Sequence, residues 1–334
     1  MKIATVAIWC IGFLPLSLVG ASAELAAAYR NGAMSRVVYR VIDNHGGIVS
    51  NAIAHVWYRS YGRPQDNANW LTRTDTNGCF VAEHRTNEKL SVLIGKEGYY
   101  NTRDEVSYFD TERNAVADGK WLPYGTVKTV VLKRIENPVE MVSSRGLDYY
   151  EYPAEDGWVG FDLQQRDWVP PFGSGMKSDM LIRFRKQNQS GGYRKTMEVS
   201  FTNNLHAGAY QMTVERFSDM TSVYDVDTNA TYSSLLEFEV VRDGKGLHRN
   251  DLGVGNYLVV RTRTEVDQNG ALKSAHYGKI YGDWRFCERG GMAIQKIVFN
   301  PIPNSTSLED AETARRSIES RRMESELRRT GRNK

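Results

Sequence analysis

The chain of 334 residues is poor in the residue types that most often hold metals or nucleotides. It has three cysteines and six scattered histidines, with no Cys-x-x-Cys pair and no His-Glu-x-x-His segment. Neither a G-x-x-x-x-G-K-[ST] loop nor a G-x-G-x-x-G loop is present. These absences disfavour a zinc peptidase and a nucleotide site, and the cysteines are too few for a disulfide framework. We therefore expect neither a cofactor nor a metal.

A surplus of charge of one sign is also missing. Lys and Arg number 43 against 40 Asp and Glu, a net charge of +3. Eight basic and six acidic residues fall between Ser305 and Lys334, so the small surplus belongs to the C-terminal end. Nucleic-acid binders carry a one-sided basic field, and a nucleic-acid partner is therefore not expected.

Long hydrophobic runs are absent except at the start. Lys2 precedes an apolar run from Ile3 to Val19, which Pro15 interrupts, and Ala21-Ser22-Ala23 follows. This order is typical of an export signal that is cleaved before Glu24. A membrane anchor is the less favoured alternative, because the run is short and broken. We expect a periplasmic, cell-surface or extracellular protein with no membrane span in its mature chain.

The two remaining cysteines, Cys79 and Cys287, lie in regions that we interpret as different domains. An oxidising compartment permits a disulfide between them, but two separately buried thiols are the favoured interpretation.

Residues 34–134 have the pattern of a first β-sandwich. Val37, Tyr39 and Val41 alternate with more polar residues, which is the period of a half-buried strand. Further strands are predicted near Ala52–Tyr58, Leu90–Ile94 and Val127–Leu132. The segment Thr74–Phe80 contains Asn-Gly, the strongest short-range signal of a hairpin. Two long insertions, Arg59–Leu71 and Tyr100–Gly125, are predicted to be loops.

Residues 138–303 have the pattern of a second β-sandwich. Short β-rich runs are separated by turn signals, and no βαβ alternation occurs. Asn269-Gly270 is a second hairpin signal of the same kind. The fold class is therefore all-β, with two sandwich domains. The predicted strands are Met180–Phe184, Thr196–Phe201, Tyr210–Val214, Leu235–Val241, Tyr257–Thr264, His276–Tyr281 and Ile294–Phe299.

Residues 304–334 are predicted to be a polar tail. Ser307-Leu308-Glu309-Asp310 resembles a capping box, and Glu312/Arg316 and Glu324/Arg328 are spaced to pair along a helix. The apolar positions are too few for a core face, so we expect a solvated helix or a disordered tail. Docking of this tail on a partner is left open.

The first domain resembles carboxypeptidase regulatory-like domains, which are small transthyretin-like sandwiches of exported bacterial proteins. The resemblance covers residues 36–134 and rests on Thr74-Asp75-x-Asn77-Gly78-x-Phe80 and Lys96-Glu97-Gly98-Tyr99. It implies a prealbumin-like fold and an accessory role, without peptidase activity. The second half is similar to the β-rich remainder of uncharacterised exported bacterial proteins, a resemblance that brings no known activity.

The segment from Trp158 to Gly173 is rich in aromatic residues and carboxylates. As a carbohydrate site it would stack rings on sugars and use carboxylates to accept hydroxyl hydrogen bonds or to act as an acid/base pair. The alternative is that the aromatics fill the core and the carboxylates cap backbone N–H groups. The candidate ligand-binding residues here are Trp158, Phe161, Asp162, Asp167 and Trp168.

Three aromatic residues of the first domain, Trp70, Trp121 and Tyr124, are further candidates because they lie in predicted loops. Asp225-Val226-Asp227-Thr228-Asn229 resembles a calcium loop, but Ala230 replaces the required glycine, and a polar turn is favoured.

The leading hypothesis is a non-enzymatic, exported structural or binding module with no catalytic residues. A cell-envelope protein or a polysaccharide is the expected partner. The alternatives are a carbohydrate-binding protein that uses these aromatics with Asp162 and Asp167, and a glycoside hydrolase that uses the same two carboxylates.

Overall fold

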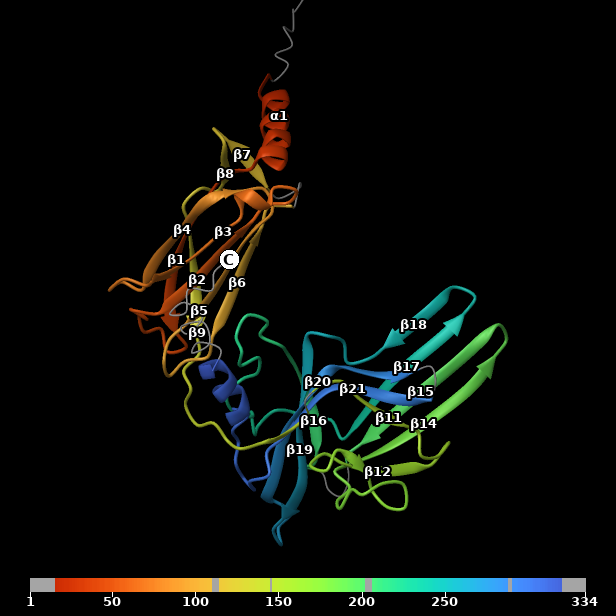
Figure 1. Ribbon diagram of the computed structural model, residues 1–334. Coiled ribbons are helices and arrows are strands. Elements are labelled where there is room, and N and C mark those ends of the chain that lie inside the picture. Colours follow the sequence, from red (N-terminus) through yellow and green to blue (C-terminus); the bar gives the residue numbers. More distant parts are fainter. Residues whose placement is uncertain (1–15, 110–113, 145, 202–205, 288–289, 320–334) are drawn as a thin grey trace, which may run out of the picture. The chain divides into compact units, whose positions relative to one another are not determined.

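The computed structural model describes residues 16–109, 114–144, 146–201, 206–287 and 290–319 (Figure 1). The chain divides into two compact units, Met1–Arg134 and Ile135–Lys334. Each unit consists mainly of β-strands arranged in two sheets around its own core, which confirms the predicted all-β class with two sandwiches.

Unit 1 contains one helix and two sheets. One sheet has the order β4-β1-β8-β7, with β9 pairing parallel to β1, and the other has the order β3-β2-β5-β6. Tyr39, Val56, Ile94 and Leu132 are completely buried between the sheets. The elements are α1 (Leu16–Asn31), β1 (Ala33–Asp43), β2 (Ile53–Arg59), η1 (Pro64–Asp66), β3 (Ala68–Arg73), β4 (Cys79–Thr86), β5 (Lys89–Gly95), β6 (Thr102–Ser107), β7 (Ala115–Ala117), β8 (Lys120–Leu122) and β9 (Thr126–Leu132).

The predicted strand faces of unit 1 are confirmed, but its predicted loops are not. Alternate residues of β1 and β2 are buried, as their sequence pattern requires. The insertions 59–71 and 100–125 contain β3 and the strands β6, β7 and β8, respectively. Three of these short strands, β3, β6 and β7, lie at the edges of their sheets. Their apolar residues do not alternate clearly along the sequence.

The predicted export signal lies mostly in residues 1–15, outside the described residues. Helix α1 runs across the predicted cleavage site between Ala23 and Glu24. Its second half, through Leu25, Ala28 and Tyr29, packs against the unit 1 core. Cleavage before Glu24 would leave these contacts in place.

The turn at Asp75–Gly78 does not form a hairpin. Strand β3 before it and strand β4 after it belong to different sheets, so the turn carries the chain from one sheet to the other. Only Gly78 has a positive φ (74°), and a Cβ there would lie 2.7 Å from the carbonyl oxygen of Val41. Asp75 Oδ1 accepts the N–H groups of Asn77 and Cys79, both at 2.8 Å.

Unit 2 also packs one sheet on another. The first sheet has the order β10-β21-β20-β19-β16, with β11 also pairing with β21, and the second has the order β13-β12-β14-β15-β17-β18. All seven predicted strands are present, several of them longer than expected. The elements are β10 (Val142–Ser143), β11 (Asp148–Glu151), β12 (Trp158–Asp162), β13 (Asp167–Trp168), β14 (Met180–Gln189), β15 (Gly192–Ser200), β16 (Gly208–Thr213), β17 (Leu235–Asp243), β18 (Gly246–Asn250), β19 (Asn256–Val266), β20 (Leu272–Cys287) and β21 (Gly291–Phe299).

The start of the predicted tail is part of unit 2, which corrects the expectation of a solvated segment. Leu308 is completely buried among apolar side chains on the outer face of the β16–β21 sheet. The buried ammonium of Lys279 donates to the Leu308 carbonyl at 2.6 Å. Residues 311–319 form the expected helix, capped by Asp310 rather than by Ser307. Residues 320–334, with the predicted pair Glu324/Arg328, lie outside the described residues.

Replacing Leu308 with alanine is expected to lower the free energy of unfolding of unit 2 by about 2–5 kcal/mol, because it leaves a cavity in a closed apolar cluster. Ile318→Ala is the control, since Ile318 is exposed on the helix that follows. Urea denaturation of both variants checks this. If both substitutions changed the free energy of unfolding by the same small amount, the tail would be solvated as the sequence predicted.

Candidate functional site

The Asp162 carboxylate, a predicted ligand contact, holds a loop together. Its Oδ1 accepts the N–H groups of Gln164 and Gln165, and its Oδ2 accepts those of Met176 and Lys177, all at 2.8–3.0 Å. Asp162 is 1% exposed. The chain between β12 and β14 is thereby tied to one buried carboxylate.

Asp167 has a similar role nearby. It accepts the N–H of Trp168 with Oδ1, and the N–H and hydroxyl of Ser174 with Oδ2. A Cβ at Gly173 would lie 2.3 Å from the carbonyl oxygen of Trp168, and one at Gly175 would be similarly close to the backbone. The loop is therefore tightly packed.

Arg263 of β19 connects this loop to the other sheet. Its Nε donates to Asp179 at 2.8 Å, its Nη2 donates to Asp162 at 3.1 Å, and its Nη1 donates to Gln164 at 2.6 Å. Arg263 also lies 4.6 Å from the centre of the Phe299 ring. The result is a buried ion network between the two sheets of unit 2.

The pKa values of both carboxyls follow from these contacts. Burial by itself would raise the pKa of Asp162, but backbone N–H groups and Arg263 outweigh it and lower the pKa below its ordinary value. Burial also opposes the hydrogen bonds that lower the pKa of Asp167. A general acid of a glycosidase needs a raised pKa, and neither carboxyl has one.

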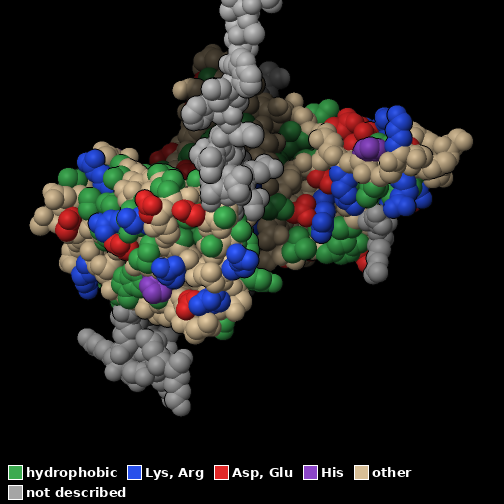
Figure 2. Space-filling model, turned by 90° about the horizontal axis from the view of Figure 1, so that it is seen from above, with side chains coloured by type: hydrophobic (Ala, Val, Ile, Leu, Met, Phe, Trp, Pro, Cys, Tyr) green, Lys and Arg blue, Asp and Glu red, His purple; other side chains and the backbone are tan. Residues whose placement is uncertain are grey.

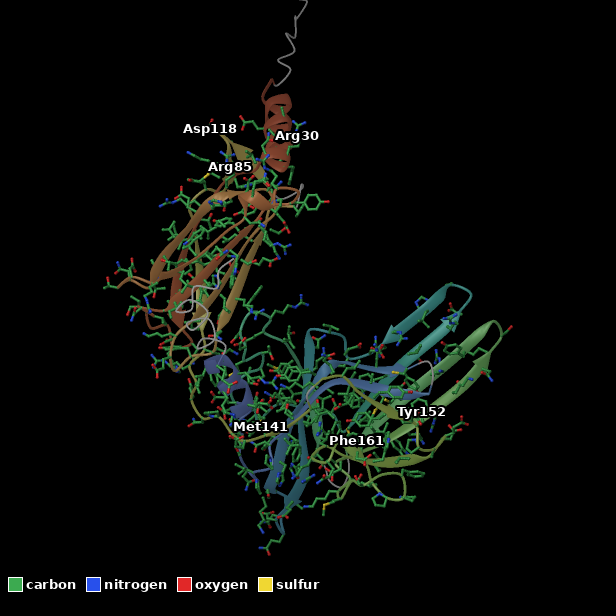
Figure 3. All side chains as sticks on the ribbon, in the orientation of Figure 1. Arg30, Arg85, Asp118, Met141, Tyr152 and Phe161 are labelled. Carbon is green, nitrogen blue, oxygen red and sulfur yellow. The ribbon has the colours of Figure 1, made fainter. Side chains whose placement is uncertain are left out.

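Two aromatic candidates of unit 2 lie in the core. Phe161 is completely buried and Trp168 is 5% exposed, and their rings meet edge to face with centroids 5.2 Å apart. Phe161 lies among the crowded side chains between the sheets (Figure 3). Trp158 is 39% exposed and stacks against Arg183, 4.4 Å from the ring centre. Of these three residues, only Trp158 is open to a ligand.

The unit 1 candidates are largely occupied too. Trp121 is buried in β8 and donates from Nε1 to the Thr86 carbonyl at 2.8 Å. Trp70 lies half-buried in β3 and stacks on Tyr58. The Tyr124 hydroxyl donates to Glu83 at 2.6 Å. These aromatic residues were expected in loops, but two of the three are strand residues that pack against the core.

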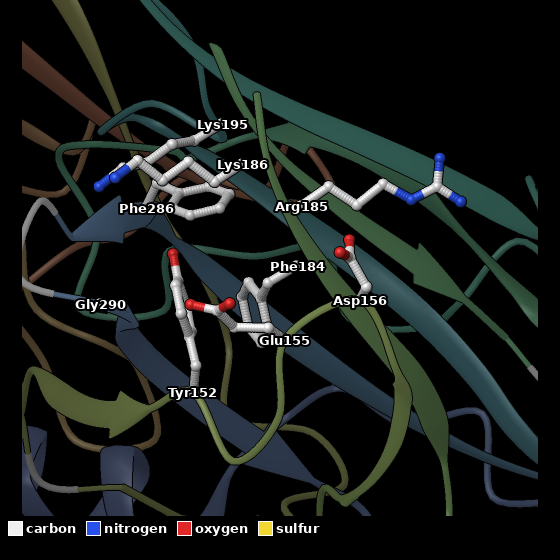
Figure 4. A pocket seen from close by; sticks show the side chains of 9 residues that line it. All are labelled: Tyr152, Glu155, Asp156, Phe184, Arg185, Lys186, Lys195, Phe286 and Gly290. Carbon is white, nitrogen blue, oxygen red and sulfur yellow. The ribbon is translucent and has the colours of Figure 1, made fainter. Parts of the chain in front are cut away.

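A cavity of about 230 Å³ lies at the margin of unit 2, and none of the candidates lines it (Figure 4). The rings of Tyr152, Phe184 and Phe286 form one side; Tyr152 stacks on Phe184 with centroids 3.8 Å apart. Three cations and two carboxylates complete the lining. They are Arg185, Lys186, Lys195, Glu155 and Asp156.

The Tyr152 hydroxyl points into this cavity between aromatic and cationic side chains (Figure 4). Its oxygen is buried and makes no hydrogen bond of normal geometry to the described residues. Burial raises the pKa of this hydroxyl, and the N–H of Gly291 opposes the rise only in part. Sequence reasoning missed the cavity because its lining comes from four separate segments.

Four other sequence predictions concern metal binding, the polar turn at Asp227, the two thiols and a membrane span. Within the described residues, no group of three or more His, Cys, Asp or Glu is placed to hold a metal. Asp227 Oδ1 caps the N–H of Asn229 at 2.9 Å, as in a polar turn. Cys79 and Cys287 are free thiols, each partly exposed rather than buried. No helix of the described chain is both long and apolar enough to span a bilayer.

The fold defines the protein as an all-β chain of two sandwich units, and comparisons with known proteins give no narrower class. No family model matches it, and no curated protein matches it. Among solved structures it is similar to 3-chlorocatechol 1,2-dioxygenase of Rhodococcus opacus 1CP, at 17% identity and a TM-score of 0.24 over 31% of this chain and 62% of that one. The chain therefore spans less than two thirds of that relative.

A second similar structure is the major pilin subunit BcpA of Bacillus cereus, at 10% identity and a TM-score of 0.22. The match covers 78% of this chain and 95% of the pilin. Likenesses at these scores carry no argument about function.

Proposed function

We propose that the protein is a non-catalytic binding module, exported to the cell envelope or beyond, in which unit 2 carries the binding surface. The observation that carries this proposal is that the polar groups of unit 2 differ in what they contact. The carboxylates of Asp162 and Asp167 accept hydrogen bonds from their own loop, whereas the Tyr152 cavity leaves space for a ligand.

Unit 1 is proposed to be a carboxypeptidase regulatory-like domain with a spacing role. Its support is the Asp75-x-Asn77-Gly78 turn together with the two sheets that pack around one core. Such a domain presents a partner unit without chemistry of its own. The export signal before Glu24 supports the envelope location.

The test combines binding with turnover. The purified chain is passed through gels that contain different polysaccharides, and the same mixtures are assayed for new reducing ends. We expect retardation by at least one polysaccharide and no release of reducing ends. Release that is lost in Asp162→Asn or Asp167→Asn would contradict a non-catalytic role, and the absence of any retardation would contradict polysaccharide as the partner.

A further inference from the structure

Four strands of unit 2 extend beyond the sheet that they pack against. Residues 185–189 of β14 and all of β18 are exposed, whereas the earlier residues of β14 alternate with buried positions. Figure 1 shows β14, β15, β17 and β18 continuing past β20 and β21. We call residues 185–195 and 240–250 the arm. Its inner face continues the core face of the sheet.

The arm has a local surplus of positive charge, although the chain as a whole is nearly neutral. It holds seven Lys and Arg residues and a single acidic residue, Asp243. Lys and Arg side chains gather on this part of the molecule, at the right of Figure 2. The net charge of +3 for the chain conceals this local surplus, because acidic residues elsewhere compensate it.

Strand register divides these cations between two faces. Phe184 and Met197 are buried partners, so Lys186 and Lys195, two residues further out on each strand, lie on the same inner face. Tyr193 and Arg242 are partners on that face as well. Asp243 follows Arg242 and points to the outer face, whereas Glu155 and Asp156 line the same cavity as the two lysines.

On the outer face, cations lie beside carboxylates of the neighbouring strands. Arg194 lies 3.2 Å from Glu239, and Arg183 and Arg185 both lie near Glu198. Carboxylates therefore neutralise the outer cations, as is usual for surface ion pairs. On the inner face, Lys186 and Lys195 are direct cross-strand partners of like charge, a placement that destabilises a sheet.

The two lysine side chains run side by side toward the mouth of the Tyr152 cavity (Figure 4). The Tyr193 ring continues this surface, with Lys195 at 5.2 Å and Arg242 at 6.0 Å from its centre. A row of cations, one partly buried ring and an aromatic cavity thus form a continuous surface.

We propose that this inner face binds an acidic polysaccharide, with one sugar ring in the Tyr152 cavity and the carboxylates of the chain along Lys186, Lys195 and Arg242. Aromatic faces stack on sugar rings, and cations pair with their carboxylates. Glu155 and Asp156 at the cavity accept hydrogen bonds from sugar hydroxyls.

The cavity size agrees with a single ring. Its volume of about 230 Å³ is below the range of about 300–1,000 Å³ for drug-sized ligands. The remainder of a polymer then lies along the arm, where its carboxylates pair with Lys186 and Lys195.

The inference rests on the proposed binding function and is tested on the full chain with polygalacturonate as the probe. Binding is measured by affinity electrophoresis for the chain and for the double variant Lys186→Gln/Lys195→Gln. We expect about tenfold weaker binding of the variant, since each exposed ion pair contributes modestly. Raising the salt concentration should weaken binding of the unchanged chain.

The matched control is Arg194→Gln/Lys245→Gln, which removes two arm cations from the outer face and from the β17–β18 turn. It should bind like the unchanged chain. Equal losses in both double variants would overturn the inner-face site, and so would tighter binding of single-stranded DNA than of polygalacturonate. Binding to neutral dextran that neither variant alters would overturn this inference while leaving the proposed binding function intact.

Discussion

Replacing Arg263 with alanine is expected to lower the free energy of unfolding of unit 2 by about 3–5 kcal/mol at pH 7. The substitution leaves the carboxylates of Asp162 and Asp179 buried without their cation. Urea titration followed by hydrogen exchange of unit 2 peptides measures the change. Arg194→Ala is the control, because its ion pair with Glu239 is half-exposed and worth less than about 1 kcal/mol.

The stability of the Arg263→Ala variant is expected to depend on pH in a characteristic way. The native pKa of Asp162 is lowered, so its contribution to stability is present above the unfolded value of about 3.9 and is lost as the pH falls through the native value. Protonation removes the uncompensated charge from the variant. The stability gap between Arg263→Ala and the unchanged chain should therefore narrow below about pH 4. A gap that is constant with pH would contradict the ion network.

Phe161→Ala is expected to cost about 3–5 kcal/mol, because Phe161 is completely buried and contacts the rings of Trp168 and Tyr150. The control is Trp158→Ala on the same strand, where the ring is 39% exposed. Its effect should stay below about 1 kcal/mol.

These two variants also decide between the interpretations of the aromatic segment. If Phe161 were a sugar contact, its loss would weaken polysaccharide binding and leave the denaturation midpoint unchanged. We expect the reverse: a lower midpoint for Phe161→Ala, and unchanged binding per folded molecule. Affinity electrophoresis below the midpoint of the variant separates the two results.

The strands of the cores could be predicted from the sequence, because a half-buried strand alternates its side chains with a period of two. Val37, Tyr39 and Val41 follow this rule and are buried. Strand β18 could not be predicted in this way, because all five of its residues are exposed. Strands β6 and β7 were also missed, because each buries only one of its residues.

The candidate site was harder to predict than the fold. An aromatic residue next to a carboxylate has the same spacing in a binding groove as in a core with a capped turn. Phe161 and Asp162 fit both, and only their burial separates the two. The residues of the Tyr152 cavity are far apart in sequence, so no local pattern joins Tyr152, Phe184 and Phe286.

A turn sequence that occurs twice shows that local sequence does not determine which strands pair. Asp75-Thr76-Asn77-Gly78 and Asp267-Gln268-Asn269-Gly270 make the same local hydrogen bonds, with the aspartate capping two N–H groups and a positive φ at glycine. The second turn closes the β19–β20 hairpin, whereas the first crosses between sheets.

Local chemistry in the sequence therefore determined the turns, the strand period and the class of fold, since these depend on neighbouring residues alone. Which strands pair, which aromatics are buried and where charge gathers were decided by the tertiary structure. Register places Lys186 opposite Lys195 and so gathers positive charge on one face of the sheet, although the chain as a whole is almost neutral. Such a field depends on distances through space, and these exist only once the sheets have formed.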